Sequence, residues 1–400
     1  MGETKRSGQK ANILLLIISY LGFISLGFPD SVIGVAWPSV REAFALGQSN
    51  LGWILFGSGA GYFLSSFFSG RVLEATGVGL LLAVSTGLVA ASAFGYALAP
   101  LWFLFALFSI LHGLGSGAID AGLNNYVAHH FSARVMNWLH ACYCVGAMLG
   151  PLVMTAVLTT GAHWRTGYVV IGSTLVVMAL LFTSTLKLWG RPEPRTGGEP
   201  VKPLSTAETL RSKAVRLNIL IFFVYTGLEF TCGQWSFTLF TEGRGIDAKT
   251  AGTWVSLYWG AIGVGRVLFG FVVERIGINR LLRYSMFAAI IGAGFLLSST
   301  SRPLMFGGLA LIGLALAPVY PCLMTATPAR LGPALAAHAI GYQTGAAMLG
   351  AAALPTLAGY LGARQGLEAI PLCALAFAAA LWLLHEGMLR GEKAKPAGSI

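Results

Sequence analysis

Charged side chains are scarce in this sequence of 400 residues: Asp, Glu, Lys and Arg together make up only 10% of it. A soluble domain normally carries about a quarter of charged residues, so an ordinary soluble protein is excluded. Hydrophobic residues make up 56% of the chain, and the mean hydropathy is +0.72. The net charge of +11 is spread between apolar segments, which argues against a nucleic-acid partner. The composition predicts an all-α helical bundle in a lipid bilayer.

Sequence motifs for catalysis and cofactor binding are also lacking. The chain has no Walker sequence, so ATP is not expected as its energy source. It has neither a recognisable metal-binding motif nor a nucleophile with a base at a suitable spacing. The five cysteines all fall in apolar segments and are interpreted as free buried thiols. We therefore expect no enzyme activity, no cofactor and no metal site.

Long apolar runs fill most of the chain. A membrane-spanning helix needs about 20 mostly apolar residues. The first run is longer than the apolar core of a signal peptide, about 7–15 residues, so we expect it to remain as a span. Twelve runs meet the length criterion: 11–35, 48–69, 77–98, 101–127, 137–160, 164–188, 215–240, 250–272, 281–300, 303–326, 334–361 and 367–388. A polar linker over 190–213 divides the chain into an N-terminal half, 1–189, and a C-terminal half, 214–400.

The basic residues predict the orientation. If the N-terminus is cytoplasmic, 19 of the 26 Lys and Arg residues fall on the cytoplasmic side and 6 on the outside, with Arg266 inside a helix. Such an excess on one side is typical of cytoplasmic loops. It requires an even number of spans and both termini in the cytoplasm. The chain has no N-x-S/T sequon, which suits a bacterial plasma (inner) membrane, and we expect a multi-pass monomer there.

The two halves repeat at an offset of about 200 residues. Residues 70–77 (Gly-Arg-Val-Leu-Glu-Ala-Thr-Gly) match residues 270–277 (Gly-Phe-Val-Val-Glu-Arg-Ile-Gly), and residues 146–150 match residues 345–350. Each half has six predicted spans, so the second half enters the membrane in the same orientation as the first. Parallel repeats of this kind are a feature of secondary transporters. The repeat therefore predicts a solute transporter of two parallel six-helix halves.

The repeated G-x-x-x-D/E-x-x-G loop resembles the signature of the major facilitator superfamily. It stands between spans 2 and 3 and again between spans 8 and 9, and the resemblance covers essentially the whole chain. The second copy is fuller, because the first has Ala75 where a basic residue is usual. The resemblance implies alternating access and a cytoplasmic gate formed by Gly70, Glu74, Gly77, Gly270, Glu274, Arg275 and Gly277.

Three carboxylates fall deep inside predicted spans: Asp30, Asp120 and Glu229. An ionisable residue there costs about 2.5–3.5 kcal/mol on insertion scales, so each one suggests a function. They lie in spans 1, 4 and 7, and the superfamily resemblance implies that spans 1, 4, 7 and 10 line a central cavity. We expect all three to bind solute and to take part in proton coupling. Pro29 opens the helix beside the first of them.

Polar and aromatic residues near these acids complete the expected solute site. Amides bind sugar hydroxyls, and aromatic faces cover sugar C–H groups, although a buried Trp or Tyr can equally be part of helix packing. His112 is interpreted as packing, and Arg266 as reaching the membrane interface. Besides the three acids, the candidates are Asn124, His140, Tyr143, Gln234, Trp235, Trp259, Tyr320, Tyr342 and Gln343.

Spans 1, 4 and 5 resemble a narrower family. Residues 27–33 (Gly-Phe-Pro-Asp-Ser-Val-Ile), residues 113–124 and residues 134–140 are similar to the fucose–proton symporter family, with His140 where Gln is usual. The resemblance implies sugar import coupled to protons, with Asp30 and Asp120 as the carboxylate pair. Two alternatives stay open: sodium-coupled sugar uptake, and proton-driven efflux of amphipathic or cationic compounds. The expected partners are a small solute, a coupling ion and the bilayer.

Overall fold

The computed structural model describes residues 2–131, 133–190, 210–331 and 333–393. Within these ranges the chain consists of helices and short connections, and no strand occurs. The predicted all-α class is therefore confirmed. Ten of the described helices are long and apolar enough to cross a membrane. One of the ten, Gln48–Leu98, contains two of the predicted spans, so the ten helices account for eleven of the twelve. The apolar helix Ile278–Leu296 corresponds to the remaining predicted span, 281–300.

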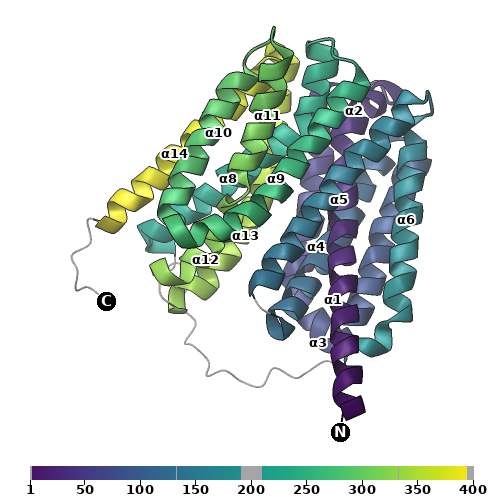
Figure 1. Cartoon of the computed structure of the whole chain (residues 1–400). Coiled ribbons are helices and arrows are strands. Elements are labelled where there is room, and N and C mark those ends of the chain that lie inside the picture. The colour runs from purple at the N-terminus through teal and green to yellow at the C-terminus, as the bar shows by residue number, and fades with distance from the viewer. Residues whose placement is uncertain (1, 132, 191–209, 332, 394–400) are drawn as a thin grey trace.

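The N-terminal half forms one bundle, drawn from purple to teal in Figure 1. Two of its six spans share the label α3 and meet at a non-helical turn at Gly77, and its first span is divided in two at Ser31, just after Pro29 and Asp30. Its helices are α1 (Gly2–Asp30), α2 (Val32–Ala43), α3 (Leu51–Leu98), α4 (Trp102–His130), α5 (Ala133–Thr159) and α6 (Trp164–Ser184).

The C-terminal half forms the second bundle, drawn in green and yellow in Figure 1. Its fourth span, the tenth of the chain, is divided at Ala317 and Pro318. Its helices are α8 (Lys213–Thr238), α9 (Ala248–Ile276), α10 (Ile278–Leu296), α11 (Arg302–Leu316), α12 (Val319–Leu331), α13 (Pro333–Gln365) and α14 (Ala369–Lys393). Most of the predicted linker, 191–209, lies outside the described residues.

The repeated signature loops have the same backbone geometry. Gly77 turns the chain inside α3 with φ 75°, and Gly277 turns it between α9 and α10 with φ 78°. L-residues with a side chain rarely adopt this left-handed conformation, whereas glycine does so at little cost. This requirement explains why each copy of the motif ends in glycine. The predicted boundary between spans 2 and 3 is therefore a reversal at one residue.

The other repeated motif places glycine where two helices meet. A Cβ atom at Gly150 would lie 2.3 Å from the carbonyl oxygen of Phe28, and one at Gly350 would lie 2.0 Å from that of Phe223. The first contact joins α5 to α1, and the second joins α13 to α8. These are corresponding helix pairs in the two halves. Close backbone contact through small residues is the usual way in which membrane helices associate.

The two bundles meet mainly through three pairs of α-helices: α5 with α9, α3 with α13, and α2 with α8. Their hydrogen bonds between side chains gather at the end of the molecule that holds the short loop after α2. There Arg41 Nη2 lies 2.7 Å from Glu242 Oε1, and Gln48 Nε2 donates to Glu242 Oε2 at 2.8 Å. Trp37 Nε1 in turn donates to Gln48 Oε1 at 3.0 Å. We call these four side chains the bridging cluster.

The signature loops lie at the opposite end, where the described halves make no such bridge. A Cβ atom at Gly70 or Gly270 would meet nothing within 4 Å. Glu74 and Glu274 have no ion pair to any side chain that the structure describes. The bundles are thus joined at the end with the bridging cluster. The expected role of these loops in gating stays a prediction.

The bridging cluster gives a first testable expectation. Glu242→Gln removes the charge that holds Arg41, so the joined end should open more often. The two side chains are 27% and 29% exposed, and pairs of this kind contribute roughly 0.2–1 kcal/mol, so we expect about a two- to fivefold change. The measurement is the labelling rate of Ser58→Cys, in the cavity wall, by an impermeant maleimide added at that end of a protein without native cysteines. Glu42→Gln, an exposed acid, is the control, and equal labelling of both variants would contradict the assignment.

Candidate functional site

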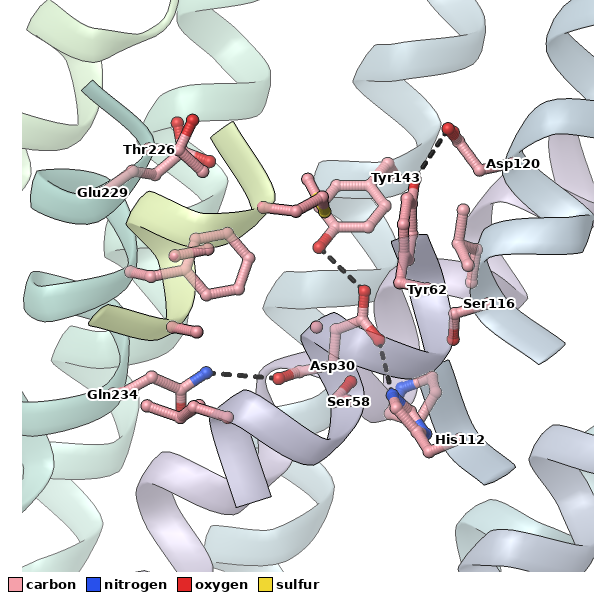
Figure 2. Close-up of a pocket in the computed structure, with 18 of the residues that line it drawn as sticks. Asp30, Ser58, Tyr62, His112, Ser116, Asp120, Tyr143, Thr226, Glu229 and Gln234 are labelled. Atoms are coloured by element: carbon pink, nitrogen blue, oxygen red, sulfur yellow. Dashed lines mark hydrogen bonds and ion pairs between the residues drawn. The ribbon is translucent and has the colours of Figure 1, made fainter. Parts of the chain in front are cut away.

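A cavity lies between the two bundles, and its walls come from both of them. Figure 2 shows Tyr62, Asp120 and Ser116 on one side, with Glu229 and Gln234 on the other. Of the residues predicted to bind solute, the cavity brings together seven: Asp30, Asp120, His140, Tyr143, Glu229, Gln234 and Tyr320. The three deep acids, far apart in the sequence, therefore share one cavity.

Asp30 is held by side chains from three other helices. Its Oδ1 atom lies 2.8 Å from His112 Nε2 on α4, and its Oδ2 atom accepts from Tyr143 OH on α5 at 3.0 Å. Its backbone carbonyl accepts from Gln234 Nε2 on α8, in the other half, at 3.3 Å. The helix break after Pro29 puts this residue at the end of α1, where side chains can reach both its carboxylate and its carbonyl.

His112 corrects an expectation, because it is a partner of Asp30 and a cavity residue, not a packing residue. The sequence contained a signal for this position. His112 continues the polar stripe of Ser116, Asp120 and Asn124 by one more turn, since residues four apart share a face of a helix. An ionisable residue on the same helix face as such a stripe should be expected at the same site as the other residues of the stripe.

Asp120 has only neutral partners among the described residues. Its Oδ2 atom accepts from Tyr62 OH at 2.7 Å, and its Oδ1 atom accepts from Asn124 Nδ2 at 3.0 Å. Asn124 does not line the cavity and acts on it through Asp120. Asp120 therefore differs from Asp30, which faces a histidine.

Glu229 is 4% exposed and accepts hydrogen bonds from two tyrosines. Its carboxylate accepts from Tyr225 OH, and its backbone carbonyl accepts from Tyr258 OH at 2.8 Å. Arg266 lies close enough to act electrostatically on Glu229, and its Nη1 atom donates to the carbonyl of His140 at 3.0 Å. Arg266 was expected to reach the membrane interface, but it lines the cavity. That expectation is wrong, because the His140 carbonyl accepts a hydrogen bond from the guanidinium and the Glu229 carboxylate attracts its charge inside the bundle.

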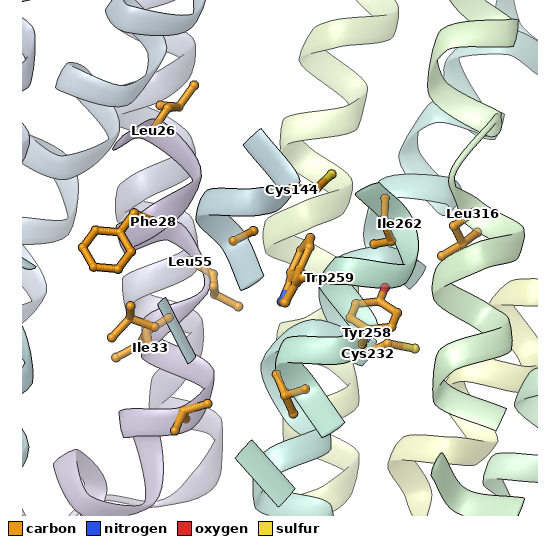
Figure 3. Close-up of a cluster of buried hydrophobic side chains, with 14 of the residues drawn as sticks. Leu26, Phe28, Ile33, Leu55, Cys144, Cys232, Tyr258, Trp259, Ile262 and Leu316 are labelled. Carbon is orange, nitrogen blue, oxygen red and sulfur yellow. The ribbon is translucent and has the colours of Figure 1, made fainter. Parts of the chain in front are cut away.

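Four other candidates lie away from the cavity walls. Trp235 is fully buried, and its indole nitrogen donates to the carbonyl of Pro355 at 2.7 Å. Trp259 packs against Phe230 beside Tyr258, within the apolar cluster of Figure 3. The other two lie on α13: the buried amide of Gln343 pairs with the Thr327 hydroxyl, and the half-buried Tyr342 does not line the cavity. In this structure, both tryptophans serve helix packing.

Several cavity residues were missed by the sequence reasoning, and most of the polar ones among them are tyrosines or small hydroxyl residues. Tyrosine on an apolar helix is easily taken for packing, because its ring fits a core. Besides Arg266 Nε, four uncharged polar atoms in the cavity walls have no hydrogen-bond partner among the described residues. They are Ser116 Oγ, Tyr168 OH, Thr226 Oγ1 and Gln234 Oε1. Buried polar atoms are nearly always paired, so these four require an explanation.

Metal ligands and disulfides are not formed in the described part of the chain. No group of three or more His, Cys, Asp or Glu side chains there is placed to hold a metal ion. All five cysteines carry free thiols. Figure 3 shows two of them, Cys144 and Cys232, inside the apolar cluster, where they pack as small apolar side chains.

Comparison with known proteins supplies the family. Residues 19–355 and 236–398 match the family model of the Major Facilitator Superfamily. The chain is 24% identical over 421 residues to Bypass of stop codon protein 6 of Saccharomyces cerevisiae, covering 95% of this chain and 84% of the yeast protein. It is 24% identical over 327 residues to the glucose/mannose transporter GlcP of Bacillus subtilis, covering 77% of this chain and 78% of that transporter.

Solved structures of the same fold include two proton symporters. The D-xylose-proton symporter superposes with a TM-score of 0.71 at 16% identity, covering 92% of this chain and 96% of that one. The fucose:proton symporter of E. coli superposes with a TM-score of 0.64 at 15% identity, covering 94% and 98% of the two chains. At such identities the likeness establishes the fold alone.

Proposed function

This chain belongs to the Major Facilitator Superfamily, and we propose that it is a secondary active transporter that imports a sugar coupled to protons. The observation that carries the proposal is the cavity between the two halves, where three carboxylates meet neutral hydrogen-bonding side chains. The proposal makes the chain a transporter and not an enzyme. It belongs in the bacterial inner membrane as a monomer, with both termini and the signature loops in the cytoplasm.

The character of the cavity walls supports a sugar as the solute. Carboxylate and amide oxygens accept hydrogen bonds from hydroxyl groups, and the ring faces of tyrosines suit the C–H faces of a sugar. Asp30, Asp120 and Gln234 offer such acceptors, while Tyr143 and Tyr320 offer such rings. The printed name of the Bacillus subtilis relative, a glucose/mannose transporter, points to the same class of solute.

The partners of the three acids suggest which one exchanges a proton. Glu229 lies beside Arg266, and Asp30 lies 2.8 Å from His112, so each has a basic group within reach. Asp120 has only the neutral groups of Tyr62 and Asn124. An ionised carboxylate in a low-dielectric cavity is costly without a cation, and a proton removes that cost. We therefore assign the coupling proton to Asp120, with Asp30 and its histidine as the adjoining site.

The transport cycle follows from these assignments. A proton from outside neutralises Asp120, the sugar binds, and the two halves rock about the cavity as rigid bodies. The sugar and then the proton leave on the cytoplasmic side. One charge crossing 100 mV supplies about 2.3 kcal/mol, and each pH unit adds about 1.4 kcal/mol. Together these support accumulation of roughly a hundredfold or more. The units that move are proposed as 1–189 and 214–400, joined by the linker 190–213.

The proposal predicts that sugar and protons move together. In proteoliposomes with a pH-sensitive dye, adding D-glucose outside should raise the external pH, and an inward proton gradient should concentrate the sugar severalfold or more. If a sodium gradient alone drives sugar uptake, the coupling ion is sodium and not the proton. Proton exit on addition of an amphipathic cation, without any response to sugar, would instead assign the chain to efflux, because Asp120 would then hold a cationic solute.

A further inference from the structure

The four unpartnered polar atoms lie on opposite walls of the cavity. Ser116 and Tyr168 belong to the N-terminal half, on α4 and α6, while Thr226 and Gln234 belong to α8 in the C-terminal half. Figure 2 shows Ser116 on one side of Asp30, with Thr226 and Gln234 on the other. All four side chains line the cavity, and each residue is no more than 5% exposed. A solute that reaches all of them contacts both halves at once.

The chemistry of these atoms restricts the partner. Three are hydroxyl oxygens, each of which can donate one hydrogen bond and accept others, and the fourth is an amide oxygen that accepts. A solute hydroxyl is also both donor and acceptor, so it can satisfy any of the four. An ionised group can satisfy only some of the four atoms, because a carboxylate only accepts hydrogen bonds and an ammonium group only donates them. The set is therefore suited to several hydroxyl groups on one molecule.

The cavity's basic side chains already have acceptors. Arg266 Nη1 donates to the carbonyl of His140 and lies near enough to Glu229 to act on it electrostatically, and His112 Nε2 lies 2.8 Å from Asp30 Oδ1. One further Arg266 atom, Nε, is buried without a bond, but the charge of its guanidinium lies beside Glu229. A solute carboxylate would have to compete with Glu229 for that charge. In the described part of the cavity, the polar atoms left over for a solute are thus mainly neutral.

From these observations we infer that the solute is a neutral, hydroxyl-rich sugar, and that Ser116, Tyr168, Thr226 and Gln234 determine which of its hydroxyls are required. The inference rests on the proposed function and narrows its substrate class from sugars in general to neutral sugars. A sugar whose hydroxyls bond to both walls of the cavity would also hold the two halves together.

Thr226 offers the sharpest test, because Thr226→Val removes one hydroxyl at nearly constant volume. The experiment measures binding of D-glucose, its monodeoxy analogues, D-glucuronate and D-glucosamine to the purified full-length protein by the shift of its thermal unfolding. The parent should bind the neutral sugar best and should bind the analogue that lacks the matching hydroxyl about ten- to a hundredfold more weakly. In Thr226→Val this analogue and D-glucose should bind equally, and Thr226→Ser should restore the difference.

Two further variants make the result specific. Ser116→Ala should remove the preference for a different hydroxyl, because it lies on the opposite wall. Thr174→Val, on the exposed surface of α6 where the hydroxyl bonds to its own helix, should leave every preference unchanged. Equal weakening of all sugars in Thr226→Val and in Ser116→Ala would overturn the inference, since it would indicate a merely structural role. Tighter binding of D-glucuronate or D-glucosamine, or no binding of any neutral sugar, would overturn it as well.

The inference and the proposed function can fail separately. If D-glucose binds with the expected pattern but an inward proton gradient does not concentrate it, proton-coupled import fails and the neutral-sugar site stands. If a proton gradient concentrates only D-glucuronate, transport stands and the neutral-sugar site is wrong.

Discussion

Asp120→Asn should abolish proton-driven accumulation of sugar and leave exchange of sugar across the membrane largely intact. The amide has nearly the shape of the carboxylate and can still accept from Tyr62 OH, which donates to Asp120 at 2.7 Å. It cannot take up and release a proton, however. The accumulation ratio should therefore fall from roughly a hundredfold to about one, because no free energy from the gradient reaches the sugar.

The measurement compares two assays on the same proteoliposomes. Uptake against a gradient reports coupling, and counterflow of labelled against unlabelled sugar reports binding and the movement of the halves alone. Asp30→Asn should reduce both, because Asp30 bonds to Tyr143 and faces His112 in the cavity. Glu42→Gln, which changes an exposed acid, should leave both assays unchanged. Full accumulation by the Asp120 variant would show that the coupling proton binds elsewhere.

Gly27→Ala should destabilise the whole N-terminal bundle. A Cβ atom on Gly27 would lie 2.1 Å from the carbonyl oxygen of Tyr143 and 3.0 Å from the backbone nitrogen of Ala147. Both contacts are with backbone, which cannot rotate away as a side chain can. Helix α1 must therefore move off α5, and overpacking of this kind costs about 1–3 kcal/mol or more. The same movement pulls Asp30 away from Tyr143, so sugar binding should weaken as well.

Thermal unfolding of the purified protein tests this expectation, and the chain supplies a matched control. Gly87 is also a glycine within a helix, but a Cβ atom there would meet nothing within 4 Å. Gly87→Ala should keep or slightly raise the unfolding temperature, because alanine loses less conformational entropy than glycine in a helix. A loss of stability in Gly87→Ala equal to that in Gly27→Ala would show that helix propensity, not contact with α5, is decisive.

Much of the architecture was predictable from the sequence because a membrane span is a property of local composition. Apolar runs indicated the helices, and the repeated motifs indicated the two halves. The glycines of those motifs also had local reasons that the structure makes plain. Gly77 and Gly277 adopt left-handed conformations, and Gly350 meets a carbonyl oxygen of α8.

The site was less predictable, because the rotation of each helix about its axis depends on its neighbours. The acids were found because charge inside a bilayer is conspicuous in any sequence. Trp235 and Arg266 show the opposite case. An aromatic residue that follows an acid in the same span can point either to the cavity or to the core, and Trp235 points to the core. A single arginine near a helix end suggests the interface, but Arg266 faces the cavity because a carboxylate from another helix lies there.

The bond from Gln234 to the Asp30 carbonyl joins the two halves at the site itself. Gly34 lies so close to Gln234 that a Cβ atom would be 2.8 Å from its Cα atom, so α2 and α8 are in backbone contact there. In the proposed cycle α8 swings away from α2, and this carbonyl then loses its partner in the same step. Opening of the access route and the change at Asp30 would therefore share one pair of atoms. The proposal needs no relay of intervening residues to tell Asp30 which side of the membrane is open.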